Sequence, residues 1–371
     1  EERIIVNFRK LEHTMIKKEC FTTEWIEQVA SELHYNDKNL IEKVIRALSL
    51  LEMLVKAGCP LVFKGGTALM LILGKSAHRL SIDIDVICPP GTNIEDYLKS
   101  FADFGFINLE LVERKHRDDA DIPKSHSKFF YHIAYRNDTD AQSYILLDVL
   151  YEDIHYFQTQ QIAIDCPFIR LEGKPLMVTV PSAEDILGDK LTAFAPNTTG
   201  IPYYKNGRSC SMEIAKQLYD VGRLFENVSV LQITAEAFRK IAVVELSYRS
   251  LGADIGQVFN DIRQTALCIS TRGKSGEGDF NLIQDGIIRV KSFIYKQRYL
   301  IDNAIIDAAR AAYLATLIEK GVTEVERYSN NPVVIKDLVI RPSLTNKLNK
   351  LKINLPEAFY YWAKTSELLE V

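Results

Sequence analysis

Several features that mark particular protein classes are missing from this chain. The six cysteines are scattered, with neither CxxC pairs nor neighbouring histidines, which excludes a zinc site and a small disulfide framework. No apolar run is long enough to cross a bilayer, and the first ten residues (EERIIVNFRK) lack a signal-peptide pattern. A net charge of −4 argues against wholesale coating of nucleic acid, but it leaves room for local basic faces. We therefore expect a cytoplasmic protein without a membrane segment.

The remaining composition is that of an ordinary globular protein, with 47% hydrophobic and 25% charged residues in a chain of 371. This length is sufficient for two domains. Helical patterns cover residues 22–58, strand patterns dominate from 60 to about 180, and helical periods return after Pro181. We therefore predict an α/β (α+β) domain with N-terminal helices at 1–180, followed by a mainly helical domain at 181–371.

Two glycines interrupt the apolar stretch LVFKGGTALMLIL, which runs from residue 61 to residue 73. Strand-favouring residues lead into Gly65 and Gly66, and Thr67 then opens an apolar helix. Glycine suits a point where the backbone turns sharply or lets a ligand come close. A helix N-terminus also offers unpaired N–H groups that suit phosphate. The pattern therefore predicts either a tight turn capped by Thr67 or a turn that binds phosphate.

An acidic strand pattern, HRLSIDIDVICPP, follows the glycines. Alternation along a strand places four polar side chains together on the face away from the core: Arg79, Ser81, Asp83 and Asp85. Two carboxylates one step apart suit Mg²⁺, which takes one or two protein carboxylates and completes its shell with water and substrate phosphates. The alternative is a solvated strand face on which the acids pair with Arg79.

A third acid lies in the stretch YILLDVLY, where Asp148 is the only charged residue. The stretch is typical of a central strand, in which a lone carboxylate is costly to bury unless it is paired or bound to a ligand. Asp148 is therefore a candidate partner of the two strand acids. The alternative is an aspartate at a strand end that reaches solvent or caps a loop.

Two charged residues stand out in the helical part of the chain. In SAEDILGDKLTAFA, Lys190 falls in the middle of the apolar side, so its ammonium either reaches past its neighbours to water or binds an anion such as phosphate. In MEIAKQLYDVGRLFE, Asp220 falls on the polar side, where an exposed pair with Lys216 one turn back is the simplest interpretation.

Taken in order, the motifs Gly-Gly-Thr-Ala-Leu, Arg-x-Ser-x-Asp-Ile-Asp, DKLTAF and KQLYD resemble those of the AbiEii/AbiGii abortive-infection toxin family. This family belongs to the DNA-polymerase-β-like nucleotidyltransferases, and the resemblance covers residues 63–224. It implies a nucleotidyltransferase-fold mixed-sheet domain, a helical C-terminal domain, and a Mg²⁺-dependent transfer of NMP from an NTP. One departure is Lys216-Gln217, where the family often has Arg-Asp, and this changes the charges around Asp220.

The resemblance also implies roles for individual residues. The nucleotide-binding residues would be Gly65, Gly66, Thr67, Arg79, Ser81 and Lys190. The catalytic residues would be Asp83, Asp85, Lys190 and Asp220. The metal ligands would be Asp83 and Asp85, joined by Asp148 if the strand register places it beside them.

The acceptor of the NMP is predicted to be RNA, in particular tRNA. One basic cluster, IIRVKSFIYKQRY, combines aromatic residues with four cations, which are Arg289, Lys291, Lys296 and Arg298. A second basic stretch runs from Lys336 to Lys352, and either cluster is alternatively a solvated helix face. The resemblance allows for an antitoxin encoded nearby. A nucleotidyltransferase that modifies a small molecule or a protein, and a non-catalytic nucleotide-binding module, stay open as other functions.

Overall fold

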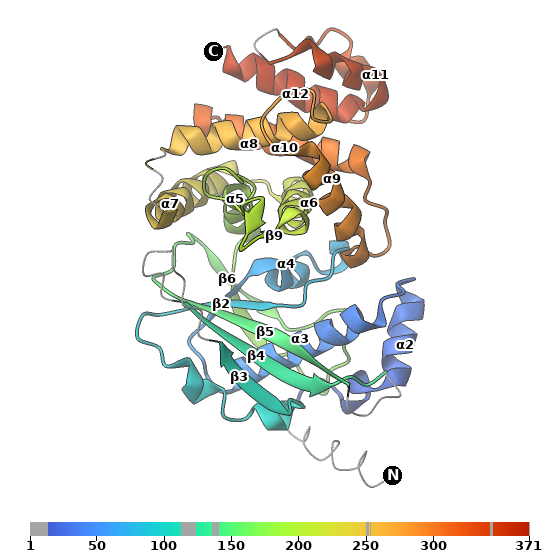
Figure 1. Ribbon diagram of the computed structural model, residues 1–371, viewed down its shortest axis with the longest axis vertical. Coiled ribbons are helices and arrows are strands. Elements are labelled where there is room, and N and C mark those ends of the chain that lie inside the picture. The colour runs from blue at the N-terminus through green and yellow to red at the C-terminus, as the bar shows by residue number, and fades with distance from the viewer. Residues whose placement is uncertain are drawn as a thin grey trace. The chain divides into compact units, whose positions relative to one another are not determined.

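The computed structural model describes residues 14–112, 124–135, 141–249, 252, 254–341 and 344–370. This part of the chain forms two compact units (Figure 1). The first unit extends to Ser182 and includes the short segment Ser292–Gln297, and the second is made of Ala183–Lys291 and the chain from Arg298 onward. The predicted mixed-sheet domain and helical C-terminal domain are confirmed. The limits 1–180 and 181–371 stay predictions, and they omit the return of the chain to the first unit.

A five-stranded mixed sheet is the frame of the first unit, in the order β1-β2-β5-β4-β3. Its strands are β1 (Val62–Lys64), β2 (Ile84–Cys88), β3 (Asn108–Val112), β4 (Lys124–His132) and β5 (Gln142–Tyr151). β2 and β5 are parallel, and the other neighbouring pairs are antiparallel. β5 therefore lies between β2 and β4, as its apolar pattern predicts. Strands β6 (Thr159–Ala163) and β7 (Met177–Pro181) pair separately.

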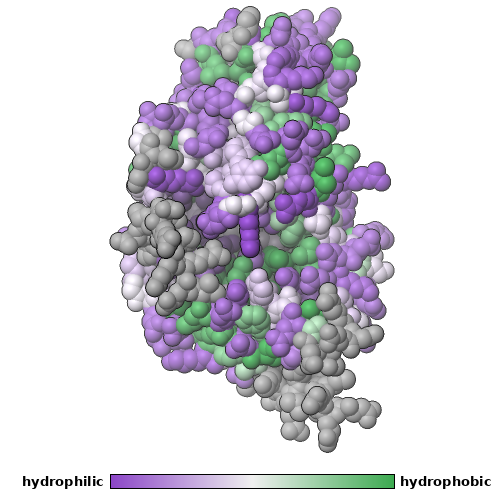
Figure 2. Space-filling model, in the orientation of Figure 1, coloured by the Kyte–Doolittle hydropathy of each residue, from purple (hydrophilic) through white to green (hydrophobic). Residues whose placement is uncertain are grey.

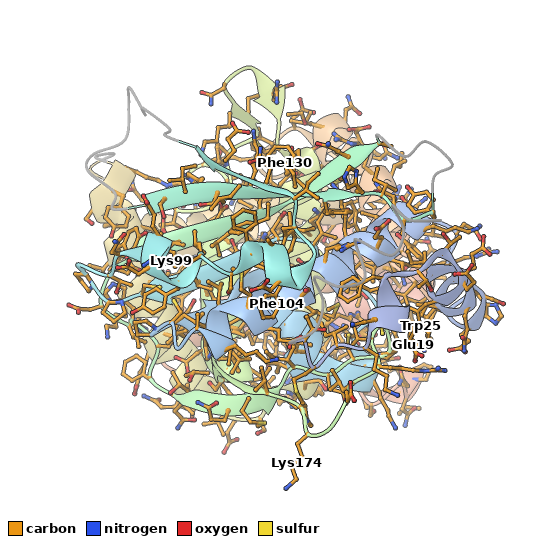
Figure 3. The ribbon with its side chains drawn as sticks, turned by 90° about the horizontal axis from the view of Figure 1, so that it is seen from below. Glu19, Trp25, Lys99, Phe104, Phe130 and Lys174 are labelled. Carbon is orange, nitrogen blue, oxygen red and sulfur yellow. The ribbon has the colours of Figure 1, made fainter. Side chains whose placement is uncertain are left out.

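The two faces of this sheet differ in burial because side chains alternate along each strand. One face carries buried residues such as Ile84, Phe129 and Leu147, which share a core with helices α2 (Thr23–Glu32) and α3 (Lys38–Lys56). On β4 and β5 the opposite face, here called the open face, carries partly exposed side chains, which are His126, Lys128, Phe130, Tyr144 and Asp148. Figure 3 shows Phe130 on the side of the sheet away from Phe104, which lies beside α3.

Short helices connect the strands of the first unit. Helix α4 (Gly65–Leu73) begins directly after β1, with Lys64 at its N-cap position, so it starts two residues earlier than predicted. The remaining short elements are 3₁₀ turns, which are η2 (Lys18–Phe21), η3 (Gly74–Ser76), η4 (Ile94–Tyr97) and η5 (Phe101–Phe104). No residue therefore separates the end of β1 at Lys64 from the start of α4 at Gly65.

The return segment Ser292–Gln297 is fixed against the stretch that precedes β2. The backbone N–H of Leu80 donates to the carbonyl of Phe293 at 2.7 Å, and that of Tyr295 donates to the carbonyl of His78 at 2.9 Å. The Tyr295 hydroxyl donates to the carbonyl of Ala77 at 2.5 Å, and its side chain is buried. A segment more than two hundred residues away in sequence thus holds the chain at the start of the acidic motif.

Helices make up most of the second unit (Figure 1). They are α5 (Ala183–Ala193), α6 (Ser211–Asn227), α7 (Leu231–Arg249), α8 (Ile255–Ser270), α9 (Phe280–Val290), α10 (Ile301–Lys320), α11 (Leu351–Asn354) and α12 (Pro356–Leu369), with 3₁₀ turns η6 (Lys291–Phe293), η7 (Pro332–Ile335) and η8 (Asn346–Lys350). A small ribbon of β8 (Tyr204–Lys205) and β9 (Arg208–Ser209) precedes α6. α10 packs against α6, α8 and α12, so it is the central helix of this unit.

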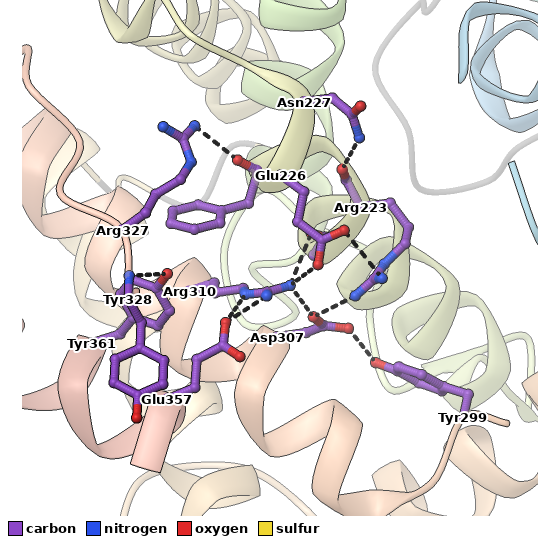
Figure 4. A network of polar contacts seen from close by, with 12 residues as sticks. Arg223, Glu226, Asn227, Tyr299, Asp307, Arg310, Arg327, Tyr328, Glu357 and Tyr361 are labelled. Carbon is purple, nitrogen blue, oxygen red and sulfur yellow. Dashed lines mark hydrogen bonds and ion pairs between the residues drawn. The ribbon is translucent and has the colours of Figure 1, made fainter. Parts of the chain in front are cut away.

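A buried network of charges joins three of these helices (Figure 4). Asp307 of α10 is fully buried and lies 3.2 Å from the guanidinium of Arg310 and 3.3 Å from that of Arg223 on α6. The Tyr299 hydroxyl donates to the second oxygen of Asp307 at 3.1 Å, and Arg310 also pairs with Glu357 of α12 at 2.5 Å. Burial raises the pKa of Asp307, and the two arginines oppose that shift. The network therefore fixes the packing of α6 and α12 on α10.

Polar side chains dominate the visible surface in Figure 2, with smaller apolar patches between them. Among the described residues, no helix is both long enough and apolar enough to cross a membrane.

Candidate active site

The glycine turn is built tightly against the acidic motif. Gly65 has φ of 78°, in the left-handed region that L side chains rarely adopt. A Cβ added at Gly65 would lie 2.2 Å from the Oδ2 atom of Asp85, and one at Gly66 would lie 2.6 Å from the Ser81 hydroxyl and 2.8 Å from Nη2 of Arg79. Both glycines are therefore required for the start of α4 to approach these side chains.

Thr67 fixes the same helix to the chain that carries the acids. Its side chain is buried, and its hydroxyl donates to the carbonyl of Asp83 at 2.7 Å. This contact joins the first turn of α4 to the residue that directly precedes β2. The predicted contact of Thr67 with a triphosphate stays a prediction.

The acidic motif lies partly outside the strand that the sequence pattern predicts for it. β2 begins at Ile84, so Asp85 belongs to the strand, whereas Arg79, Ser81 and Asp83 lie in the segment before it. The reason is that the backbone N–H of Leu80 pairs with the return segment and not with a strand of the sheet. Arg79 and Ser81 nevertheless lie at the glycine turn, because both side chains are beside Gly66.

Register brings four polar residues into one row across the sheet. Asp85 is opposite Lys64 of β1 on one side and Asp148 of β5 on the other, and Asp148 is opposite His126 of β4. Directly paired residues present their side chains on the same face. Asp148 was predicted to join the metal ligands if the strand register places it beside Asp83 and Asp85. The register places it beside Asp85.

His126 is a site residue that the sequence pattern does not reveal. Its Nδ1 atom lies 2.5 Å from the Oδ1 atom of Asp148, whose side chain is 39% exposed. The two residues are 22 positions apart, and only the pairing of β4 with β5 joins them. Asp148 is thus an open-face carboxylate oriented by an imidazole, and not an isolated charge inside a strand.

Lys43 of α3 is a second residue that the sequence does not single out. Burial lowers the pKa of its ammonium group, and the charges of Asp83 and Asp37 oppose this shift. Its Nζ atom lies 5.5 Å from the centre of the Tyr144 ring on the open face. A cation is therefore close enough to Asp83 to affect the charge balance at the acidic motif.

Asp83 and Asp85 form a donor set that fits Mg²⁺. Mg²⁺ in phosphoryl-transfer sites uses one or two protein carboxylates, with water and substrate phosphates as its other ligands. The missing side chain at Gly65 lets the Asp85 carboxylate lie close to the first turn of α4, where a helix N-terminus suits phosphate oxygens. Within residues 14–112, 124–135 and the other described ranges, no three or more His, Cys, Asp or Glu side chains are arranged as a complete metal site. The roles of Asp83 and Asp85 as metal ligands stay predictions.

The second unit contains a buried ion pair between two of the predicted catalytic residues. Lys190 of α5 is 8% exposed, and its Nζ atom lies 3.2 Å from the Oδ2 atom of Asp220 on α6. It also donates to the side-chain oxygen of Gln217 at 3.0 Å. The expectation that Asp220 is an exposed partner of Lys216 is wrong, because Asp220 is 1% exposed. Gln217, the departure from the family pattern, is instead a direct partner of Lys190.

Two of the three aromatic residues of the first basic cluster are not available as an RNA surface. Tyr295 and Tyr299 are 4% and 3% exposed, since Tyr295 packs into the first unit and Tyr299 joins the buried network of the second. In the second basic stretch, Lys352 donates to the carbonyls of Lys336 and Leu338 at 2.8 and 3.0 Å. The cations of both clusters are nevertheless mostly exposed, so the clusters keep their charge at the surface but lose two of their aromatic rings.

Comparison with known proteins identifies the family. Residues 48–330 match the family described as "Nucleotidyl transferase AbiEii toxin, Type IV TA system", whereas a comparison with curated proteins gives no match. Two similar solved structures come from Helicobacter pylori: JHP933 (17% identity, TM-score 0.40) and a putative nucleotidyltransferase (18%, TM-score 0.37), each with 76% of this chain and 94% of the other covered. A third is MenT4, a nucleotidyltransferase toxin from Mycobacterium tuberculosis (11%, TM-score 0.42, coverage 78% and 89%). This chain belongs to the AbiEii family of nucleotidyltransferase toxins of type IV toxin-antitoxin systems.

Proposed function

We propose that this nucleotidyltransferase moves NMP from an NTP to RNA, in particular tRNA, in a Mg²⁺-dependent reaction in the cytoplasm, and that an antitoxin encoded nearby controls it. The observation that carries the proposal is the close approach of the glycine turn to the acids. An added Cβ at Gly65 would lie 2.2 Å from the carboxylate of Asp85. A phosphate bound at the start of α4 would therefore be close to a metal ion held by that carboxylate.

The first unit supplies the nucleotide and metal contacts. The backbone N–H groups at Gly65, Gly66 and Thr67 would face the triphosphate, since the first turn of a helix has no partners for them within the helix. Asp83 and Asp85 would hold Mg²⁺. Bound Mg²⁺ would neutralise charge on the phosphates and so favour phosphoryl transfer.

Three further residues of the first unit take proposed roles. Asp148 would complete the metal site, supported by its register opposite Asp85 and by the imidazole of His126 that orients it. Arg79 and Ser81 would contact the nucleotide, supported by their position beside Gly66 at the start of α4. A guanidinium and a hydroxyl are suitable donors to phosphate oxygens.

Lys190 would contact phosphate and stabilise charge on the leaving pyrophosphate. This role is supported by the burial of the Lys190 ammonium group, which Asp220 and Gln217 hold in one position. An ammonium held in a fixed position costs little reorganisation when charge develops on a substrate. Asp220 would act as the positioning acid of this pair.

The test is incubation of the purified protein with Mg²⁺, each labelled NTP in turn, and total cellular RNA. The expected result is label in RNA with at least one NTP and no label when EDTA replaces Mg²⁺. Label on a protein or a small molecule, with none in RNA, would contradict the proposed acceptor. The absence of both NTP binding and transfer would instead favour a non-catalytic module.

A further inference from the structure

Two aromatic rings are neighbours on the open face of the sheet. The ring centres of Phe130 on β4 and Tyr144 on β5 lie 5.7 Å apart, with planes inclined at 56°. Tyr144 is 40% exposed, although the opposite face of the same strand is buried. Figure 3 shows Phe130 on this side of the sheet. Aromatic rings on an exposed sheet face are a common platform on which nucleic-acid bases stack.

Two lysines converge on one of these rings. The Nζ atoms of Lys43 on α3 and Lys128 on β4 each lie 5.5 Å from the centre of the Tyr144 ring. Lys128 forms a long ion pair with Glu110 at 3.6 Å. The negative charges of Asp83 and Asp37 raise the pKa of Lys43, against the effect of burial. Two ammonium groups beside one ring provide positive charge that attracts an anion bound there. The cluster of Phe130, Tyr144, Lys43 and Lys128 is called the open-face cluster below.

The strand order places this cluster on the far side of the acids from the glycine turn. β2 with Asp85 lies between β1, which leads into the glycines, and the pair β5 and β4. Tyr144 precedes Asp148 by four residues on β5, which corresponds to about 13 Å at roughly 3.3 Å per residue. That distance equals about four steps of a stacked strand at roughly 3.4 Å each. A single nucleic-acid strand whose end lies at the acids would therefore be long enough, after about four nucleotides, to extend over the open-face cluster.

We propose that the open-face cluster binds the single-stranded end of the acceptor RNA, with a base stacked on Tyr144 and phosphates held by Lys43 and Lys128. Bases stack on aromatic rings with little regard to sequence, and lysines beside the rings follow the phosphates. The inference rests on the proposed function for the position of the reacting end, but binding itself requires neither NTP nor transfer. The aromatic groups that stack with bases thus come from β4 and β5, and the lysines that follow the phosphates come from β4 and α3.

The experiment measures binding of a fluorescein-labelled single-stranded RNA decamer by anisotropy, without NTP. Tyr144→Ala should weaken binding about tenfold, whereas Tyr144→Phe, which keeps the ring, should bind like the unchanged protein. Lys128→Gln should make the slope of log affinity against log salt shallower by about 0.7, the value for one phosphate contact in a single strand. Lys99→Gln is the matched control, because Lys99 is an exposed lysine of the same unit outside the cluster, and it should leave both quantities unchanged.

A second measurement separates the acceptor from the nucleotide. NTP binding with Mg²⁺, followed by calorimetry, should be unaffected by Tyr144→Ala. Loss of NTP binding with RNA binding retained would overturn the proposal and assign the ring to the nucleobase. No RNA binding by the unchanged protein, or equal binding by Tyr144→Ala with an unchanged melting temperature, would also overturn it. RNA binding that depends on Tyr144, in a protein that transfers no NMP, would uphold the cluster and contradict the proposed function alone.

Discussion

Lys190 and Asp220 form a buried ion pair, and such a pair responds strongly to the loss of one partner. Lys190→Met leaves the Asp220 carboxylate buried without its cation, which should lower the free energy of unfolding by about 3–5 kcal/mol. If Lys190 also contacts phosphate, transfer should fall by a further factor equivalent to about 2–3 kcal/mol. Thermal denaturation and steady-state transfer rates measure the two effects.

A double variant separates stability from chemistry at this pair. Lys190→Met combined with Asp220→Leu removes both charges, so it should recover most of the stability lost in the single variant. Transfer should remain lost in the double variant, because the phosphate contact is still missing. Recovery of transfer together with stability would show that the pair is purely structural.

His126 orients a proposed metal ligand, so its removal should be visible in the metal dependence of the reaction. His126→Ala leaves Asp148 without the imidazole at 2.5 Å, and transfer should fall about 10–100-fold, with a higher Mg²⁺ concentration needed for half-maximal rate. Rates measured over a Mg²⁺ titration test this. An unchanged Mg²⁺ dependence would mean that Asp148 does not take part in metal binding.

The turn from β1 into α4 is the element on which the site depends. Gly65 and Gly91 have φ of 78° and 83°, but a Cβ at Gly65 would meet Asp85 at 2.2 Å, whereas one at Gly91 would meet nothing within 4 Å. Both alanine substitutions should cost about 1 kcal/mol of stability through backbone strain. Gly65→Ala alone should also displace Asp85 and abolish transfer. Equal transfer rates in Gly65→Ala and Gly91→Ala would contradict the close fit of turn and acid.

At this scale, local patterns predict elements better than they predict their partners. The apolar and aromatic stretch YILLDVLY correctly indicates a central strand, and the GG motif correctly indicates the passage from a strand to a helix. The predicted ends of an element are wrong where a distant segment takes the backbone hydrogen bonds. The backbone of Leu80 pairs with the return segment, so the strand of the acidic motif begins at Ile84. Within the strand-rich region from 60 to 180, the segment from Asn93 to Phe104 contains two 3₁₀ turns, η4 and η5.

Residues of the site that come from other elements were not predictable from spacing. His126 reaches Asp148 through the register of an antiparallel pair, and Lys43 approaches Asp83 from a helix whose sequence shows only amphipathic periodicity. The burial of Lys190 does follow from its helical period, but the identity of its partners does not. Tertiary packing determines such contacts, and no local propensity encodes them.

At the scale of the whole molecule, a family assignment over residues 48–330 shows the type of reaction, and the central proposal is that Asp83 and Asp85 hold the Mg²⁺ that this reaction requires. The most direct measurement is NMP transfer from labelled NTP to RNA by Asp83→Asn and Asp85→Asn, with Asp153→Asn as an exposed control. Relief of carboxylate repulsion should keep the melting temperatures of the two site variants at or above that of the unchanged protein. The account predicts no transfer by either site variant and normal transfer by the control. Near-normal transfer by both site variants, with Mg²⁺ present, would contradict it.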